Sequence, residues 1–320
     1  MEFKLSEQGV SIQHDPKVTE YLLQYELPSP PNVRYGFVRF SSSQEKYRVQ
    51  LFGQAWLPNH SVGTILFIHG YSEHTGNYGK LMHEFVNANF GVASLDLRGH
   101  GLSEGARGHT DTPTAYAEDV EQFLSILFPH LTPHRPLFLW AHSMGGLIAL
   151  QVLDRKKLPI APTAVCLTSP LLGFPPLHGL QKTLAKIAPL VAKFFPVLQI
   201  PHDLQPSNLS HDEAYLAKRA KDPLMITNTT PKWFLCVKEV VESMQAKASQ
   251  FVELAPTMLF LAGQEKITNL TEARKFAFHA YASLKHKVIE FPGMHHELEK
   301  EPAVRARLVS ESLAWFKSKI

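Results

Sequence analysis

Short apolar runs and amphipathic stretches follow one another along most of the chain. Residues 35–41 and 47–56 alternate apolar and polar positions, which is typical of half-buried strands, and a polar turn at 42–46 separates them. Six further runs have the length of buried strands, at 64–68, 91–96, 136–140, 164–167, 257–261 and 287–291. Helical patterns stand near 78–89, 113–129, after Ser143, near 271–282 and at 302–319. This alternation predicts an α/β fold with a mostly parallel, eight-stranded sheet and helices on both faces.

The alternation has an irregular start and one long interruption. Between residues 169 and 251 the chain is rich in Pro, Leu, Phe and Lys, and we interpret this segment as a helical cap insertion above the carboxyl ends of the strands. The alternative is a second structural subdomain with no role toward a substrate. Residues 1–32 are irregular in pattern and end in a Pro-Ser-Pro-Pro cluster, which indicates a linker or a packed arm. The predicted division is an N-terminal arm at 1–32, a core at 33–168 and 252–320, and the cap at 169–251.

Composition restricts the partners and the compartment. The 32 Lys and Arg nearly balance the 29 Asp and Glu, the net charge is +3 and the pI is near 8.7, so we expect no nucleic-acid partner. The chain shows neither the apolar stretch of a secretory signal nor a run long enough to span a membrane, and a soluble protein is expected. Only two cysteines are present, Cys166 and Cys236, which favours a reducing compartment such as the cytoplasm.

One serine follows an apolar strand and precedes an apolar helix. The turn reads Ala141-His142-Ser143-Met144-Gly145-Gly146, directly after the strand at 136–140. This strand, turn and helix are the context of a nucleophile elbow, in which small residues leave room around the serine. Gly145 leaves the backbone after the serine bare, and Ala141 stands where the motif usually has its first glycine. Such a pentapeptide also arises by chance, and a serine in an ordinary tight turn is the alternative.

A serine hydroxyl is a weak nucleophile at neutral pH, so it needs a histidine to accept its proton and an acid to orient that histidine. After a nucleophile elbow, the acid precedes the histidine along the chain. The loop after the last predicted strand offers His296, with His295 as the alternative. The loop after the strand at 257–261 ends on Glu265, and no aspartate follows Asp222, so Glu265 is the candidate acid. A solvated loop charge is its alternative interpretation.

Acyl transfer at such a serine places negative charge on the former carbonyl oxygen, and backbone N–H groups must stabilise that charge. One donor is expected from the residue after the serine, Met144. The second is expected from the loop after the third strand, where Tyr71 follows His69 and Gly70. Tyr71 and Met144 are therefore the candidate oxyanion-hole residues.

Four motifs occur in one order along the chain. They are His69-Gly70-Tyr71-Ser72-Glu73-His74, the stretch from Asp96 to Gly105, the turn from Ala141 to Gly146, and His296-Glu297-Leu298. Together they resemble the monoacylglycerol lipase and lysophospholipase branch of the α/β-hydrolases, from about residue 35 to the end. The resemblance implies an α/β-hydrolase fold, hydrolysis of a carboxylic ester of a single-chain lipid, no cofactor or metal, and a cap that shapes the acyl pocket.

Three features depart from the pattern of that branch. Ala141 replaces the first elbow glycine, Glu265 replaces the usual aspartate, and about 30 residues precede the first strand. None removes a needed functional group, although the side chain of Glu265 has one more methylene to position. The motif at 96–105 is interpreted as structural, and Glu73 and His74 as residues that brace the oxyanion loop.

Within the predicted cap, apolar residues recur at helical spacing and lysines gather on another face. The apolar residues are Leu184, Ile187, Ala188, Val191 and Phe194, and the lysines are Lys182, Lys186 and Lys193. This helix could contact a membrane surface, lead an acyl chain toward Ser143, or pack on the core; Pro189 is expected to kink or end it. A small-ester carboxylesterase or serine aminopeptidase on the same scaffold and a non-catalytic binding module are the alternative functions. The oligomeric state stays open.

Overall fold

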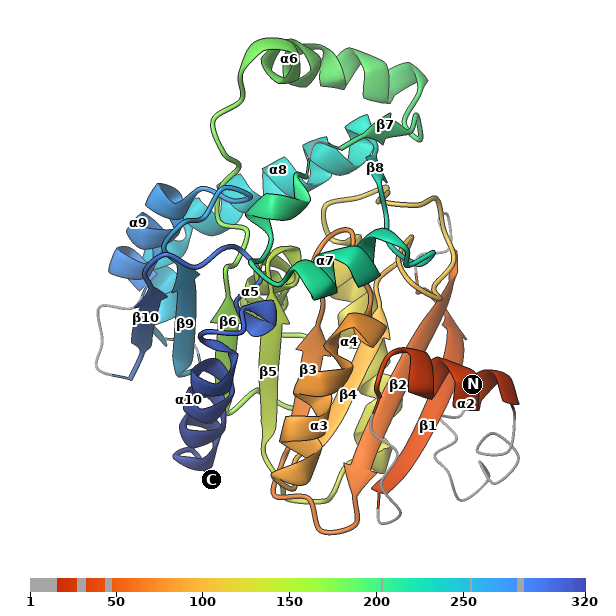
Figure 1. The fold of residues 1–320 in the computed structure, drawn as a ribbon, viewed down its shortest axis with the longest axis vertical. Coiled ribbons are helices and arrows are strands. Elements are labelled where there is room, and N and C mark those ends of the chain that lie inside the picture. Colours follow the sequence, from red (N-terminus) through yellow and green to blue (C-terminus); the bar gives the residue numbers. More distant parts are fainter. Residues whose placement is uncertain (1–15, 28–32, 44–47, 203, 254, 281–284) are drawn as a thin grey trace.

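The computed structural model of the chain describes residues 16–27, 33–43, 48–202, 204–253, 255–280 and 285–320. An eight-stranded sheet runs through the centre, in the order β1-β2-β4-β3-β5-β6-β9-β10 (Figure 1). β2 pairs antiparallel with β1 and β4, and all other neighbours are parallel, which confirms the predicted sheet. The strands are β1 (Val33–Ser41), β2 (Gln50–Pro58), β3 (Thr64–Ile68), β4 (Gly91–Asp96), β5 (Leu137–His142), β6 (Ala164–Thr168), β9 (Thr257–Ala262) and β10 (Lys287–Phe291).

Side chains alternate between the two faces of each central strand, so the sheet has an apolar core on both sides. On β3, Leu66 and Ile68 belong to one core, whereas Phe67 belongs to the other. Helices from different parts of the chain cover each face (Figure 1). The first face has α4 (Ala115–Leu127), α5 (Met144–Arg155), α8 (Pro231–Ala246) and α9 (Leu270–Ala280), and the second has α3 (Gly79–Asn87) and α10 (Arg305–Lys317). Burial on both faces explains why the central strands are continuous apolar runs.

The described part of the N-terminal arm contains a helix, α2 (Pro16–Gln24), where the sequence pattern predicts irregular chain. Leu22 and Tyr25 are buried in the second core, and the Tyr25 hydroxyl donates to Asp222 Oδ1 over 3.1 Å. A helix of nine residues is marginal alone, so this tertiary packing explains why it forms. Residues 1–15 and 28–32, which include the Pro-rich cluster, lie outside the described residues.

In the described residues between β6 and β9, the chain forms three α-helices, two short 3-10 helices and one short strand pair. The α-helices and strands are α6 (Gly179–Phe194), β7 (Ile200–Pro201), α7 (Glu213–Ala220), β8 (Asn228–Thr229) and α8. Figure 1 shows α6 at one end of the molecule, beyond α8, while α8 itself contributes buried residues to the first core. Pro189 lies inside α6, which continues to Phe194, so the proline does not end this helix as the sequence allowed. Among the helices in the described ranges, none combines the length and apolar character needed to cross a bilayer.

Candidate active site

Ser143 lies on the turn between β5 and α5 and has an uncommon backbone conformation, with φ 51° and ψ −119°. A residue other than glycine is strained in this region, so its surroundings must hold it there. The Ser143 N–H donates to the Thr168 carbonyl over 3.0 Å, and the Ser143 carbonyl accepts from the Gly146 N–H at 2.9 Å. The strand, turn and helix expected around this serine are therefore present. Ser143 is 8% exposed and lines a pocket.

Small residues allow the backbone to approach closely around Ser143. A Cβ atom on Gly145 would lie 2.3 Å from the carbonyl oxygen of Ile68, and one on Gly70 would lie 3.2 Å from Cβ of Ser143. Both distances are shorter than comfortable carbon contacts, so glycine is required sterically at Gly145 above all. Ala141 is fully buried in the first core and pairs with Ile68 across β3 and β5. Its methyl group is thus accommodated at the position where the motif usually has glycine.

The structure brings the three candidate residues of the sequence analysis into one chain of hydrogen bonds. His296 Nε2 lies 2.8 Å from Ser143 Oγ, and His296 Nδ1 lies 2.6 Å from Glu265 Oε2. With the imidazole proton on Nδ1, His296 donates to the carboxylate and accepts from the serine hydroxyl. His295, the alternative, does not join them, because its ring stacks on His211 instead.

The loop after β9 positions the longer side chain of Glu265. Its Oε1 accepts the backbone N–H groups of Ile267 and Thr268, over 2.7 and 3.0 Å, and its Oε2 is left for His296. Two contacts to one oxygen fix the carboxylate within its own loop. The additional methylene of glutamate is therefore taken up locally, and the side chain is buried, which is inconsistent with a solvated loop charge.

The pKa values of His296 and Glu265 move in opposite directions. Burial alone would lower the pKa of His296, but the charge and hydrogen bond of Glu265, together with the charges of Glu297 and Glu299, outweigh it, and the pKa is raised above its ordinary value. Burial alone would raise the pKa of Glu265, but His296 and the two backbone N–H groups bring it below its ordinary value. Glu265 thus stays charged beside an imidazole that is a stronger base than in water.

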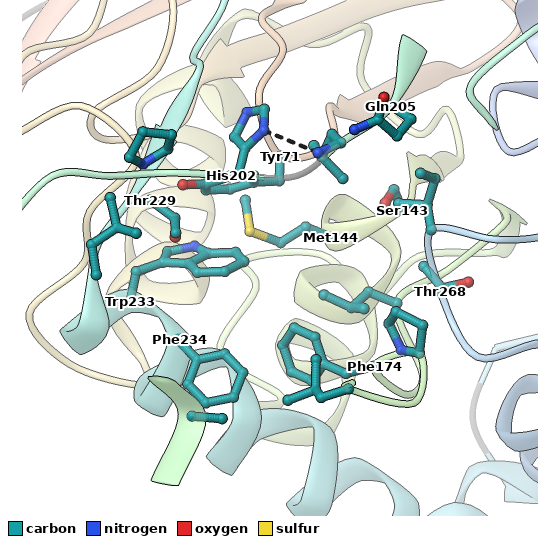
Figure 2. A pocket seen from close by; sticks show the side chains of 18 of the residues that line it. Tyr71, Ser143, Met144, Phe174, His202, Gln205, Thr229, Trp233, Phe234 and Thr268 are labelled. Atoms are coloured by element: carbon teal, nitrogen blue, oxygen red, sulfur yellow. Dashed lines mark hydrogen bonds between the residues drawn. The ribbon is translucent and has the colours of Figure 1, made fainter. Parts of the chain in front are cut away.

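The two candidate oxyanion donors line the pocket together with Ser143 (Figure 2). Met144 is the first residue of α5, and the first N–H groups of a helix have no acceptor within it. Among the described residues, no hydrogen bond occupies the backbone N–H of Tyr71 or of Met144. Both N–H groups are therefore available to an oxygen atom bound beside Ser143.

His69, at the end of β3, holds the backbone that leads to Tyr71. The Leu97 N–H donates to His69 Nε2 over 2.9 Å, so this nitrogen carries no proton, and His69 Nδ1 donates to the Gly70 carbonyl over 2.8 Å. Burial lowers the pKa of His69 to about 4, which keeps this neutral tautomer. In the sequence, His69 stands out only as part of a motif. Its place directly after a buried strand and before a glycine is the signal that could have identified it.

The Tyr71 side chain connects the same loop to the segment between β6 and β9. Its hydroxyl lies 2.9 Å from the Asn228 carbonyl of β8 and 3.1 Å from the Gly108 carbonyl. Its ring lies 4.1 Å from the Trp233 ring of α8, measured between centroids. Figure 2 shows both side chains in the wall of the pocket. Trp233 and Asn228 are far from Tyr71 in sequence and contact it only in the folded chain, and no motif in the sequence indicates them.

The stretch at 96–105 has the structural role expected from the sequence. The carboxylate of Asp96 accepts the N–H groups of Thr75 and Leu102, each over 2.8 Å. His74 Nε2 lies 3.0 Å from Asp222 Oδ2, which ties the oxyanion loop to the chain after α7. His74 thus braces this loop, as predicted, and its partner Asp222 belongs to the 169–251 segment.

A pocket of about 500 Å³ extends from Ser143 between α6 and α8. This volume is in the range of small-molecule sites. Apolar side chains make up most of its wall: Leu171, Phe174, Leu184, Ile187, Ala188, Val191, Trp233 and Phe234. Figure 2 shows Phe174, Trp233 and Phe234 on one side of this space and Ser143 on another. The site thus places a hydroxyl that hydrogen-bonds a histidine in the wall of a mostly apolar cavity.

Three buried glutamates lie close enough to His296 and to one another to affect their pKa values: Glu73, Glu297 and Glu299. Burial, followed by the nearby charges of Glu297 and Glu299, raises the pKa of Glu73 to about 8. Burial likewise raises the pKa of Glu299 to about 7. The Tyr78 hydroxyl donates to Glu73 Oε1 over 2.9 Å, and Gly70 packs against that same oxygen. Glu73 therefore braces the loop between Gly70 and Tyr78 as a largely neutral side chain.

The strand order, the two helical layers and the serine turn define an α/β-hydrolase. The family model described as "Serine aminopeptidase, S33" matches residues 59–303, which is well over half of the chain. The chain belongs to this family.

Relatives cover most of the chain. It is similar to phospholipase YtpA of Bacillus subtilis, with 28% identity over 77% of this chain and 92% of the relative. It is also similar to a monoacylglycerol lipase of Mycolicibacterium smegmatis, with 25% identity over 79% and 88%. Among solved structures, the monoacylglycerol lipase of Paleococcus ferrophilus superposes with a TM-score of 0.74 at 25% identity, covering 84% of this chain and 99% of that one.

The raised pKa of Glu73 predicts a pH-dependent cost in stability. Between its ordinary pKa and about 8, the folded chain retains a proton that the unfolded chain releases, so the free energy of unfolding falls as pH rises through this window. Glu73→Gln mimics the neutral form and should raise Tm at pH 9, with a smaller effect at pH 5. Each kcal/mol gained in the free energy of unfolding corresponds to about 2 °C or more in Tm. Thermal unfolding at both pH values measures this, with exposed Glu239→Gln as control. An equal effect of Glu73→Gln at pH 5 and pH 9 would contradict it.

Proposed function

We propose that the chain is a carboxylic ester hydrolase in which Ser143 is the nucleophile, His296 the general base and Glu265 the residue that orients His296. The observation that carries this proposal is the continuous hydrogen-bond chain from Glu265 through His296 to Ser143, at the end of an apolar pocket. An unactivated serine has no such partners. A non-catalytic binding module has no need for a strained serine with a buried base.

The proposed reaction follows from these positions. Ser143 Oγ attacks the ester carbonyl while His296 Nε2 takes its proton, and the carbonyl electron pair moves onto the oxygen. The N–H groups of Tyr71 and Met144 donate to this oxyanion. When this electron pair re-forms the carbonyl double bond, the bond between the carbonyl carbon and the alcohol oxygen breaks, and His296 gives its proton to that oxygen. Water, deprotonated by His296, then releases the carboxylic acid from the acyl-enzyme and restores Ser143.

The proposed substrate is an ester of a single-chain lipid, such as a monoacylglycerol or a lysophospholipid. The apolar wall contributed by α6 and α8 suits one acyl chain, since burial of each methylene contributes about 0.8 kcal/mol. Relatives named monoacylglycerol lipase and phospholipase support the same substrate class. We further propose that α6, β7, α7 and β8 act as the cap over this pocket, while α8 belongs to the core.

The family description favours one second candidate, a serine aminopeptidase. Such an enzyme needs a charged carboxylate to hold the substrate ammonium group. Glu73 and Glu297 line the pocket, but the raised pKa of Glu73 makes it largely neutral, and Glu297 lies 3.8 Å from the guanidinium of Arg219. The pocket therefore suits an acyl chain better than a cation.

We also propose transient contact of α6 with a lipid surface. One side of the helix lines the pocket, and another side exposes Leu190 and Phe194, at 62% and 63%. The chain after it exposes Phe195, Val197 and Leu198 as well, a larger apolar patch than isolated surface residues make. Buried, unpaired Cys166 and Cys236 are in keeping with the proposed cytoplasmic location.

A fluorophosphonate probe tests the nucleophile directly. We expect one adduct on Ser143, located by mass mapping, because His296 activates only this hydroxyl. Labelling and hydrolysis of a monoacylglycerol should both disappear in Ser143→Ala and in His296→Ala, while exposed His279→Ala behaves as the unmodified chain. Retained hydrolysis in Ser143→Ala would refute the proposal. Faster cleavage of an aminoacyl anilide than of the lipid ester would favour the aminopeptidase.

The pH profile of kcat/KM tests the role of Glu265. The base must be neutral, so activity falls as pH drops through the pKa of His296. Glu265→Gln removes the charge that raises this pKa, so the acidic limb should move to lower pH while kcat falls roughly 10²- to 10⁴-fold. Glu239→Gln should leave both unchanged. An acidic limb at the same pH in Glu265→Gln would show that Glu265 does not set the pKa of the base.

Vesicles test the surface contact of α6. The double variant Leu190→Glu with Phe194→Glu should hydrolyse a vesicle-bound monoacylglycerol at least about tenfold more slowly, because two apolar side chains lose their contact with the bilayer. Its hydrolysis of a short, water-soluble ester should not change, since neither side chain lines the pocket. Phe278→Glu on α9 is the control, because Phe278 is an apolar side chain on another helix that is even more exposed, at 76%. Equal losses on both substrates would contradict surface contact.

A further inference from the structure

Ser72 follows Tyr71 in the loop after β3 and has a left-handed backbone, with φ 64°. The residue is fully buried, and it is not among the described residues that line the pocket. A glycine adopts this conformation without strain, whereas a serine is held in it by its surroundings. The hydroxyl is the group that serine has and glycine lacks, so a role specific to Ser72 must lie in the contacts of this hydroxyl.

The hydroxyl of Ser72 contacts the proposed cap at three points. It donates to the Ile226 carbonyl, in the segment between α7 and β8. It accepts from Arg219 Nη2 of α7 over 3.3 Å, and His202 Nε2, directly after β7, lies 3.3 Å from it. His202 Nε2 also lies 2.7 Å from the Ile226 carbonyl, so these groups form one connected cluster. The hydroxyl thus ties the loop after β3 to three parts of the proposed cap.

The peptide group that carries the Tyr71 N–H is held from two directions. Its carbonyl belongs to Gly70, and this oxygen accepts from His69 Nδ1 over 2.8 Å, which fixes the peptide group against the core. A trans peptide group has its carbonyl and its N–H on opposite sides, so the Tyr71 N–H points away from that hydrogen bond. The chain that follows is fixed by the contacts of the Tyr71 and Ser72 side chains with the cap.

We propose that Ser72 is a positioning residue of the proposed oxyanion hole, and that its hydroxyl holds the Tyr71 N–H in place by fixing the loop after β3 to the cap. This inference rests on the proposed function and extends it, because the cap then contributes to the rate of the chemical step as well as to the acyl pocket. An oxyanion donor acts through its direction and distance, and a shift of about 1 Å costs roughly 10²-fold in rate. A contact that fixes the donor loop therefore acts on kcat, although Ser72 does not touch the substrate.

Ser72→Gly tests the hydroxyl without adding backbone strain. If Ser72 served only the turn, kcat and Tm would stay the same or rise, because glycine fits φ 64° better than serine. The proposal predicts that kcat on a monoacylglycerol falls roughly 10- to 10²-fold in Ser72→Gly and in Ser72→Ala, while KM changes less than about twofold because the pocket wall is intact. Exposed Lys156→Gly, at φ 53° after α5, is the matched control and should leave kcat unchanged. Unchanged kcat in Ser72→Gly would overturn the proposal.

A trifluoromethyl ketone separates the oxyanion hole from the rest of the site. Ser143 Oγ adds to its carbonyl carbon while His296 takes the hydroxyl proton, and the carbonyl electron pair becomes an oxyanion in the oxyanion hole. The affinity for this ketone should therefore fall in Ser72→Gly by about the same factor as kcat. The acidic limb of kcat/KM should stay at the same pH, because Glu265 still holds His296. Reduced kcat with undiminished affinity for the ketone would contradict a role in the oxyanion hole.

Hydrogen exchange of the full chain gives a readout that does not depend on ester hydrolysis. Loss of the hydroxyl in Ser72→Ala, which keeps the Cβ atom, should raise exchange about tenfold in both segments that it joins, at 70–74 and 225–229. Lys156→Gly should leave both segments unchanged. Unchanged exchange in Ser72→Ala would overturn the proposal in a chain that hydrolyses esters. Absence of hydrolysis and of probe labelling in the unmodified chain would instead refute the enzymatic function, and faster exchange would still establish that Ser72 holds this loop.

Discussion

The backbone of Ser143 is the constraint on which the site depends. Its φ of 51° is held by the hydrogen bond from its N–H to Thr168 and by the approach of Gly145 to the carbonyl of Ile68. These contacts come from β6 and β3, the neighbours of β5 in the sheet. The strain at one residue is thus distributed over three adjacent strands, and a parallel sheet buried on both faces is rigid enough to maintain it.

The sheet order also explains why three residues far apart in sequence meet. Ser143, Glu265 and His296 each follow a strand, β5, β9 and β10, and the carboxyl ends of parallel strands lie at one edge of a sheet. Their positions were therefore predictable from strand order and residue type alone. The choice between His295 and His296 rests on side-chain direction, since neighbouring residues in a loop point to different sides. Only the structure shows that His295 turns toward His211.

Features that depend on contacts through space were not predictable in the same way. Helix α2 forms because Leu22 and Tyr25 find an apolar surface, and its nine residues are too short a run for periodicity alone to identify it. The neutral tautomer of His69 depends on Leu97, 28 positions later in the chain. The apolar wall of the pocket combines α6 with α8, and burial, followed by the charges of Glu297 and Glu299, raises the pKa of Glu73. Each is a property of packing between elements, and hydrophobic periodicity predicts single elements only.

Glu265 accepts two N–H groups from its own loop, at Ile267 and Thr268, and this restricts the length of the acid side chain. An aspartate at the same position would end about one carbon–carbon bond short of these donors or of His296, and could not satisfy both. The length of the acid side chain and the path of the loop that follows it are therefore matched to each other in this chain.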